Sequence, residues 1–268
     1  MARRRLDAEL VRRGLADSRE RAQSLIRDQR VRIRGVVADK PARQVDPADP
    51  ITVSESEEHS WASRGALKLV GALDDFGASG FAGPAGRRCL DAGASTGGFT
   101  DVLLAGGATT VLAVDVGYGQ LHWRLRTDER VQVLDRTNIR HLTPADLPWR
   151  PELLVADLSF ISLRTVLSAL SDLPTDDGDM LLMVKPQFEV GREKLGKSGV
   201  VRDPELRAEA VSGVCQRAWD LGWGTAGVVA SKLPGPSGNV EYFVWLRRSA
   251  GPVDHDVISA AIAGGPQT

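Results

Sequence analysis

Glycines and acidic side chains occur together where an apolar stretch of the sequence ends. Asp91 follows Cys89-Leu90, and Gly93, Gly97 and Gly98 come within the next seven residues. Glycine lets the backbone take positive φ and lets a ligand lie directly against it. The spacing differs from G-x-G-x-x-G, and no Lys-Ser/Thr pair follows as in a phosphate-gripping loop. We therefore expect this turn to hold a ligand without phosphates, although tight packing between a strand and a helix remains the simpler alternative.

A second acid indicates what that ligand could be. Asp115 ends the apolar stretch 110–114 and lies 24 residues (115 − 91) after Asp91, where the next strand of a nucleotide-binding fold holds a ribose diol. S-adenosylmethionine is a nucleoside with a sulfonium cation and an amino-acid tail, and acids such as Asp91, Asp115 and Asp157 suit it better than lysines would. The residues expected to bind this cofactor are Asp91, Gly93, Ala94, Ser95, Gly97, Gly98, Phe99, Asp115, Val116, Asn138 and Asp157.

Lysines in apolar surroundings are the candidates for acid–base chemistry. Lys185 directly follows the apolar stretch 180–184, and Asp157 ends the preceding one, so the two would face each other across a cleft. Lys68 falls between apolar neighbours in an expected helix that reaches Phe76, and Glu241 begins the last expected strand. Each lysine could instead simply extend to solvent.

The elements that must position these residues alternate between strand and helix. This order predicts a doubly wound, mostly parallel sheet, completed by two consecutive strands near the end. The strands are expected at 88–92, 110–115, 130–135, 152–157, 179–184, 225–230 and 240–247, and the helices at 97–105, 119–126, 162–170 and 203–221.

The first 50 residues differ in charge from the rest. They hold 12 Arg and one Lys against 8 acids, about +5, whereas the remaining residues carry about −6. Two short helices, at 6–14 and from Asp17 or Ser18 onward, precede a strand in which Arg30, Arg32 and Arg34 alternate with apolar residues. Such a surface could bind a phosphate backbone, or be an ordinary solvated basic face. The expected RNA-binding residues are Arg3, Arg4, Arg12, Arg13, Arg19, Arg21, Arg30, Arg32 and Arg34.

Composition excludes several classes of protein. Only Cys89 and Cys215 occur, without CxxC spacing or clustered His, so we expect buried thiols, a reducing cytoplasm and no metal site. No apolar run of about 18 residues and no secretory signal pattern are seen, which predicts neither a membrane span nor a membrane partner.

Several motifs resemble known families. Residues 3–53 resemble the S-four-type RNA-binding module of ribosomal proteins and RNA-modifying enzymes. The motifs Asp-Ala-Gly-Ala-Ser-Thr-Gly-Gly-Phe-Thr, Val-Asp-Val-Gly-Tyr-Gly-Gln-Leu, Asp-Leu-Ser-Phe-Ile-Ser, Val-Lys-Pro-Gln-Phe-Glu and Gly-Pro-Ser-Gly-Asn-Val-Glu-Tyr-Phe resemble the TlyA family over residues 3–247. This family is called hemolysins but understood as ribosomal RNA 2′-O-methyltransferases.

The resemblance implies a Rossmann-like α/β methyltransferase sheet with a small N-terminal α+β RNA-binding domain. The expected domains are 1–55 for RNA binding, a linker at 56–63 and the methyltransferase at 64–248. Residues 249–268 are rich in Gly, Pro and Ala, so we expect a flexible tail there, with one weak helix as the alternative. The tetrad of FtsJ-like enzymes corresponds to Lys68, Asp157, Lys185 and Glu241. The implied reaction is methylation of a ribose 2′-hydroxyl, expected on a cytidine, in ribosomal RNA within ribosomal subunits, with Lys185 as the base.

One segment departs from the family pattern, and other functions stay open. The linker usually begins Arg-Ala-Trp, whereas this chain has His59-Ser60-Trp61, so coupling between domains through that Arg is in doubt. A base-amino methyltransferase would use Asp/Asn-Pro-Pro-Tyr/Phe at 157–160, but both prolines are missing. A non-catalytic ribosome assembly factor and a pore-forming protein are the remaining alternatives, and the intact tetrad and the lack of a long amphipathic segment argue against them.

Overall fold

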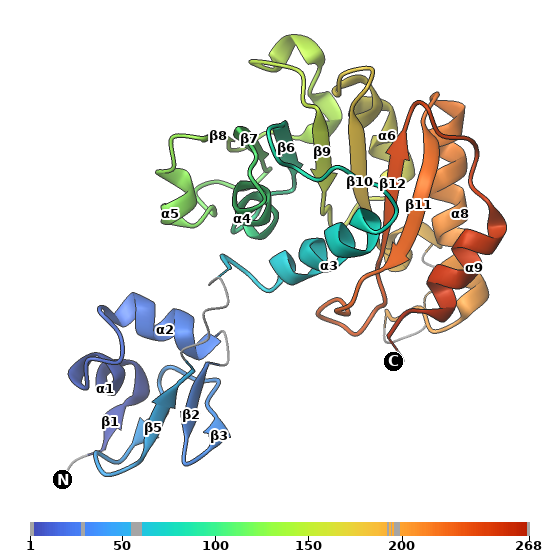
Figure 1. Cartoon of the computed structure of the whole chain (residues 1–268). Helices are drawn as coiled ribbons and strands as arrows, with labels where there is room; N and C mark the ends of the chain where they lie inside the picture. Colours follow the sequence, from blue (N-terminus) through green and yellow to red (C-terminus); the bar gives the residue numbers. More distant parts are fainter. Residues whose placement is uncertain are drawn as a thin grey trace. The chain divides into compact units, whose positions relative to one another are not determined.

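The computed structural model describes residues 3–27, 30–54, 61–191, 193, 195 and 199–266 (Figure 1). The chain divides into two compact units, Met1–Ser60 and Trp61–Thr268. Most of the expected linker 56–63, including His59 and Ser60, lies outside the described residues, whereas Trp61 and the two residues after it belong to the second unit.

The N-terminal unit packs two helices against short strands. Its core holds Leu6 and Leu10 from the first helix, Leu25 and Ile26 from the second, and Val31 from the sheet. The structure adds two strands that the sequence analysis missed, because a two-residue strand has no periodicity to detect. The elements are β1 Arg4–Arg5, α1 Leu6–Arg12, α2 Arg19–Arg27, β2 Val31–Ile33, β3 Val36–Val37, β4 Gln44–Val45 and β5 Ile51–Val53; β1 pairs with β4, and the other sheet has the order β3-β2-β5.

A seven-stranded sheet organises the second unit, which confirms the predicted fold class. The strand order is β11-β12-β10-β9-β6-β7-β8, with the last five parallel and both β11 and β12 antiparallel to their neighbours. The expected strands all form, within a residue or two of their expected bounds. They are β6 Arg88–Ala92, β7 Thr110–Val114, β8 Val131–Leu134, β9 Leu153–Ala156, β10 Asp179–Val184, β11 Gly224–Ala230 and β12 Tyr242–Arg247.

Helices cover both faces of this sheet, so its central strands are apolar on both sides (Figure 1). In β10, Leu182 and Val184 pack against α6 and α8, while Leu181 and Met183 pack in the core that α3 and α4 complete. Successive residues of a strand point to opposite faces, so both layers are needed to bury β10. The helices are α3 Gly65–Gly77, α4 Gly98–Ala105, α5 Trp123–Arg126, η1 Ile139–His141, η2 Pro144–Asp146, α6 Leu163–Asp172, α7 Pro186–Glu189, α8 Pro204–Asp220 and α9 His255–Ala263.

The end of the chain differs from the expected flexible tail. Residues 255–263 form α9, which contacts α8 and β11 and buries Ile258 and Ala261. Asp254 caps the helix by accepting a hydrogen bond from the backbone N–H of Asp256 at 2.9 Å. The Gly, Pro and Ala content of this segment indicates at most a weak helix, and the contacts with α8 and β11 stabilise it.

Within the described residues, no helix combines the length and apolar character that crossing a bilayer requires.

Candidate active site

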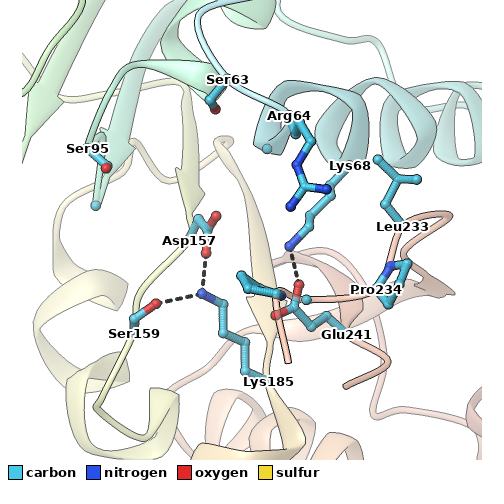
Figure 2. Close-up of a pocket in the computed structure, with 14 residues that line it drawn as sticks. Ser63, Arg64, Lys68, Ser95, Asp157, Ser159, Lys185, Leu233, Pro234 and Glu241 are labelled. Atoms are coloured by element: carbon cyan, nitrogen blue, oxygen red, sulfur yellow. Dashed lines mark hydrogen bonds and ion pairs between the residues drawn. The ribbon is translucent and has the colours of Figure 1, made fainter. Parts of the chain in front are cut away.

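A pocket of about 510 Å³ opens where the predicted catalytic residues converge (Figure 2). Its walls come from the start of α3, the carboxyl ends of β6, β9 and β10, and the loop between β11 and β12. Ligands of open α/β sheets bind at this edge because the strand ends expose backbone groups and turns there. The lining residues are Ser63, Arg64, Gly65, Lys68, Gly93, Ser95, Asp157, Ser159, Lys185, Leu233, Pro234, Gly235, Pro236 and Glu241.

One lysine in the pocket is paired with a buried acid. Lys68 Nζ lies 2.5 Å from Glu241 Oε2, and the Glu241 side chain is only 1% exposed. A Cβ on Gly235 would lie 2.6 Å from Glu241 Oε1, so glycine at that position lets the β11–β12 loop close over the carboxylate. The loop and α3 thus hold this ion pair in a fixed place, and its partners are 173 residues apart in sequence.

The second lysine has a more open partner. Lys185 Nζ lies 2.5 Å from Asp157 Oδ1, whose side chain is 24% exposed, and donates a hydrogen bond to Ser159 Oγ at 2.8 Å (Figure 2). The contact with Asp157 is an ion pair outside hydrogen-bond geometry, since Asp157 Oδ1 has no hydrogen-bond partner among the described residues. All four predicted catalytic residues therefore line one pocket, as two lysine–carboxylate pairs.

Backbone geometry shapes the pocket wall at the end of β6. Gly93 has φ of 86°, and a Cβ there would lie 2.6 Å from the carbonyl oxygen of Asp157. Glycine therefore lets the turns after β6 and β9 come into contact. Ser95 also has positive φ, 48°, and its backbone N–H donates to Asp115 Oδ2 at 2.8 Å. The turn is thus held by hydrogen bonds in a shape that places Gly93 and Ser95 on the pocket wall.

The carboxylates at this edge favour a cationic ligand. Asp91 is fully buried, and burial raises its pKa to about 7. The nearby charges of Asp157 and Asp115 also raise this pKa, whereas the hydrogen bond from Thr100 lowers it. Asp91 Oδ1 has no hydrogen-bond partner within the described part of the chain. A positively charged group bound here would relieve this repulsion and favour the ionised form. The residues therefore fit a cofactor with a sulfonium and an ammonium group.

Other predicted cofactor residues lie at the rim or in the core. Asp115 is half-buried and also accepts the backbone N–H of Gly117 at 2.7 Å, while Val116 is 68% exposed beside it. Asn138 is exposed and caps η1 through the N–H of Arg140. Phe99 differs most from expectation: it is 4% exposed and its ring packs in the core beside Phe243.

Three small residues of the predicted set support the loop from behind the pocket. Ala94 is buried in the core, and Gly97, with φ of 96°, precedes α4. A Cβ on Gly98 would lie 2.3 Å from Ser63 Oγ, so this glycine lets the segment before α3 pack on the cofactor loop.

The N-terminal unit uses several of its arginines internally. Glu9 is fully buried and contacts Arg12 at 2.6 Å and Arg13 at 2.8 Å, and Asp7 contacts Arg19 at 3.3 Å and Arg5 at 2.9 Å. Hydrogen bonds from Arg12 lower the pKa of Glu9 to about 2, and those from Arg5 hold the pKa of Asp7 well below its usual range.

Arg13 is the clearest departure from the predicted RNA-binding set. Besides Glu9, its guanidinium donates to the carbonyl oxygens of Asp49 and Pro47, both at 2.8 Å, so the side chain joins α1 to the loop before β5. Arg34 lies outside β2, with φ of 52°, and pairs with Asp49 at 2.6 Å.

The remaining predicted arginines stay at the surface of this unit. Arg3, Arg4, Arg21 and Arg32 are exposed, while Arg30 is partly buried and donates to the carbonyl oxygen of Ser54.

Several residues of the site were not predicted from the sequence. Arg64 stands four residues before Lys68, a spacing that places both on one face of a helix, and that signal could have revealed it. Ser159 follows Asp157 by two residues, yet nothing in its type marks it as a partner of Lys185. Next to it, Phe160 is 93% exposed and has φ of 63°, which is unusual for an aromatic residue.

Comparison with known proteins identifies the family of both units. A family model described as FtsJ-like methyltransferase matches residues 61–248, and an S4 domain model matches residues 4–51. The 16S/23S rRNA (cytidine-2′-O)-methyltransferase TlyA of Mycobacterium tuberculosis is 57% identical over 99% of this chain and 100% of its own length. The 23S rRNA (cytidine-2′-O)-methyltransferase TlyA of Campylobacter jejuni is 37% identical over 69% of this chain and 70% of its own.

Solved structures agree as well. A hemolysin-named protein from Streptococcus thermophilus aligns with a TM-score of 0.74 and 34% identity, covering 98% of this chain and 97% of that one. This coverage includes residues of both units. The chain therefore belongs to the TlyA family of FtsJ-like methyltransferases, with an S4 domain before the methyltransferase domain.

Proposed function

We propose that this protein transfers a methyl group from S-adenosylmethionine to the ribose 2′-hydroxyl of a cytidine in ribosomal RNA within a ribosomal subunit. The observation that carries this proposal is the pair of lysine–carboxylate contacts in one pocket, Lys68 with Glu241 and Lys185 with Asp157. A ribose hydroxyl is a weak acid, so its attack on a methyl group requires a base and a neighbouring positive charge. The two relatives named as rRNA cytidine methyltransferases support the same substrate.

The cofactor supplies a methyl group on a positively charged sulfur, and its transfer breaks the S–CH₃ bond, forms the O–CH₃ bond and leaves a neutral thioether. The carboxylates Asp91, Asp115 and Asp157 would hold the cationic and ribose groups of the cofactor. Asp115 has the most direct support for ribose binding, since it follows β7 at the sheet edge and is half-buried. Gly93 and Ser95 would form the backbone surface beneath the cofactor.

The partners of the two lysines support different roles for them. Glu241 is 1% exposed, so removing the proton of Lys68 would leave an almost fully buried carboxylate without a counter-charge. Asp157 is 24% exposed and water can solvate it, so deprotonation of Lys185 costs less. Lys185 is therefore the base that takes the 2′-hydroxyl proton, and Lys68 is the cation that stabilises the developing alkoxide.

The N-terminal unit supplies affinity for RNA in this proposal. Its exposed arginines, including Arg4 and Arg32, would contact phosphates, and binding would weaken steeply with salt as counterions are released. A chain beginning at Trp61 should then bind the cofactor but fail to methylate ribosomal RNA.

A transfer assay with ribosomal subunits tests the proposed function. Purified full-length protein and methyl-labelled S-adenosylmethionine are incubated with each ribosomal subunit, prepared from cells that lack this gene. Nuclease digestion and mass spectrometry then locate the methyl group. We expect 2′-O-methylcytidine, with the added mass on the sugar fragment. A methyl group on the base fragment would instead support the base-amino alternative, and no transfer to either subunit would refute the proposal.

A further inference from the structure

The direction of the Lys185 ammonium depends on one hydroxyl. Ser159 Oγ accepts the hydrogen bond from Lys185 Nζ at 2.8 Å, whereas the contact with Asp157 lacks hydrogen-bond geometry (Figure 2). Among the described residues, Ser159 is the hydrogen-bond acceptor of Lys185 Nζ. An ion pair attracts over a range of directions, but a hydrogen bond favours a narrow one. Asp157 therefore supplies charge at Lys185, and Ser159 supplies orientation.

We propose that Ser159 is a positioning residue for methyl transfer, which aims Lys185 Nζ at the substrate hydroxyl. This proposal rests on the proposed function, in which Lys185 is the base. An amine nitrogen has three tetrahedral positions besides its carbon. With one position directed at Ser159 and the ion-paired Asp157 close to the nitrogen on another side, a third position remains for a group in the pocket that Lys185 lines. In the neutral amine that third position is the lone pair, which accepts the proton.

Ser159 itself is held in place by its own loop. The loop starts at Asp157, which packs closely on Gly93. A Cβ on Gly93 would lie 2.6 Å from the Asp157 carbonyl oxygen. Phe160 directly after Ser159 has φ of 63°, so the chain turns sharply there. Positive φ at an aromatic residue is costly and persists only where the surroundings fix it.

Glu189 joins the end of this loop to the segment that carries Lys185. The Glu189 carboxylate is 4% exposed and accepts hydrogen bonds from Ser162 Oγ at 2.6 Å, from the backbone N–H of Leu163 at 2.7 Å and from Arg164 Nε at 3.2 Å. Glu189 lies on α7, which begins directly after Lys185. The distance between Ser159 and Lys185 is thus set by contacts on both sides of the hydrogen bond.

A hydroxyl suits this position better than a second carboxylate. An uncharged oxygen can hold the ammonium without adding a full negative charge, which would bind the proton of Lys185 more strongly. Serine therefore fixes the direction of the nitrogen while leaving it able to release and take up a proton.

The test compares Ser159→Ala with Ser159→Thr, which keeps the hydroxyl. We expect the single-turnover rate of methyl transfer to ribosomal subunits to fall about 10- to 100-fold in Ser159→Ala, as for a misplaced catalytic group. Ser159→Thr should recover most of the rate. The calorimetric affinity of both variants for S-adenosylhomocysteine should stay within about twofold of that of the parent protein, since a misplaced base mainly affects the chemical step. Ser168→Ala, a matched change at an exposed position of α6, serves as the control.

A second measurement needs no methyl transfer. Competitive acetylation of the free protein across a pH series, read by mass spectrometry of the Lys185 peptide, reports where this amine loses its proton. Ser159 accepts a hydrogen bond from the ammonium form of Lys185 and so favours that form. Ser159→Ala should therefore move the midpoint of acetylation to lower pH, and Ser159→Thr should not.

The outcomes separate the two proposals. Equal acetylation midpoints in the parent protein and Ser159→Ala would overturn the role of Ser159, whatever the enzyme methylates. Equal losses of rate in the Ala and Thr variants would also overturn it, because the hydroxyl would then not be the feature that matters. Failure of the unaltered protein to methylate either ribosomal subunit, with a shifted midpoint in Ser159→Ala, would refute the proposed function alone.

Discussion

In the N-terminal unit, the buried acids Asp7 and Glu9 each pair with two arginines, whereas in the methyltransferase unit the buried Asp91 accepts hydrogen bonds from the hydroxyl and the backbone of Thr100. The pKa of Glu9 falls to about 2, and burial raises the pKa of Asp91 to about 7. Burial by itself disfavours a carboxylate, so its partners decide the direction of the shift. In the first unit the buried acids fix arginines, whereas in the second unit no ion pair to Asp91 is found among the described residues.

The same contrast separates the two lysines of the pocket. Lys68 pairs with an acid that is almost completely buried, and the N-terminal arginines likewise pair with buried acids. Lys68 is therefore expected to remain a cation. Lys185 contacts the partly exposed acid Asp157 and the hydroxyl of Ser159, and is expected to release and take up its proton.

The largest expected effect comes from replacing Lys185. Lys185→Ala should lose about 10²–10⁴-fold in single-turnover methyl transfer with both ligands still bound, because positioned proton transfer contributes about that much. Lys185→Arg should not rescue, since a guanidinium stays protonated. Lys68→Arg should retain more activity, because the charge would be kept. Near-normal rates in Lys185→Arg would show that Lys185 is only a source of charge and that the two lysines do not differ as proposed.

A smaller effect is expected for cofactor affinity at Asp115. Asp115→Ala should weaken cofactor binding by about 1.5–3 kcal/mol, as for a lost hydrogen bond to a charged group. Calorimetry with S-adenosylhomocysteine measures this change. Because Asp115 also accepts the N–H groups of Ser95 and Gly117, part of the loss would come from the loop. Asp135→Ala, at an acid paired with Arg126 outside the pocket, is the control. Unchanged affinity in Asp115→Ala would contradict its assignment to the cofactor.

The contribution of Glu9 to the stability of the N-terminal unit should depend on pH in a defined window. The folded-state pKa of Glu9 is about 2, below its ordinary value of 4.5, so its contribution to stability is full above about pH 4.5 and is lost as the pH falls toward 2. Hydrogen exchange of the α1 peptide should therefore be faster in Glu9→Gln than in the parent protein at pH 6, with little difference near pH 2. A difference that stays constant across this range would exclude the ionised carboxylate as its source.

Asp91 should show the opposite sign of pH dependence. Its folded-state pKa is raised to about 7 from 3.8, so the folded protein holds a proton that the unfolded chain releases, and stability falls as pH rises between these values. Asp91→Asn removes this dependence. In urea unfolding of the second unit, the variant should gain stability relative to the parent from pH 5 to pH 8. Parallel stability curves for the two proteins would place the ionisation of Asp91 outside this range.

Local pattern in the sequence determined the order of elements in the second unit. Continuous apolar stretches at 88–92, 152–157 and 179–184 predict buried parallel strands, because strands covered on both faces need apolar residues at every position. Since such strands align their carboxyl ends, Asp157 and Lys185 were expected to meet, and they do. The motif resemblance assigned Lys68 and Glu241 to the same tetrad as Asp157 and Lys185, a grouping that the local pattern alone did not give.

Only the tertiary structure decided which groups pair. Lys68 meets Glu241 rather than Asp157 because β12 inserts beside β10 and its preceding loop closes over α3, and no local pattern encodes that strand order. Arg13 resembles its exposed neighbours in sequence, but the fold brings two carbonyl oxygens of a distant loop to its guanidinium. Phe99 follows a cofactor loop and yet turns into the core, because the first turn of α4 faces the sheet. These outcomes depend on contacts between segments far apart in the chain, whereas the sequence by itself specifies local conformation and burial.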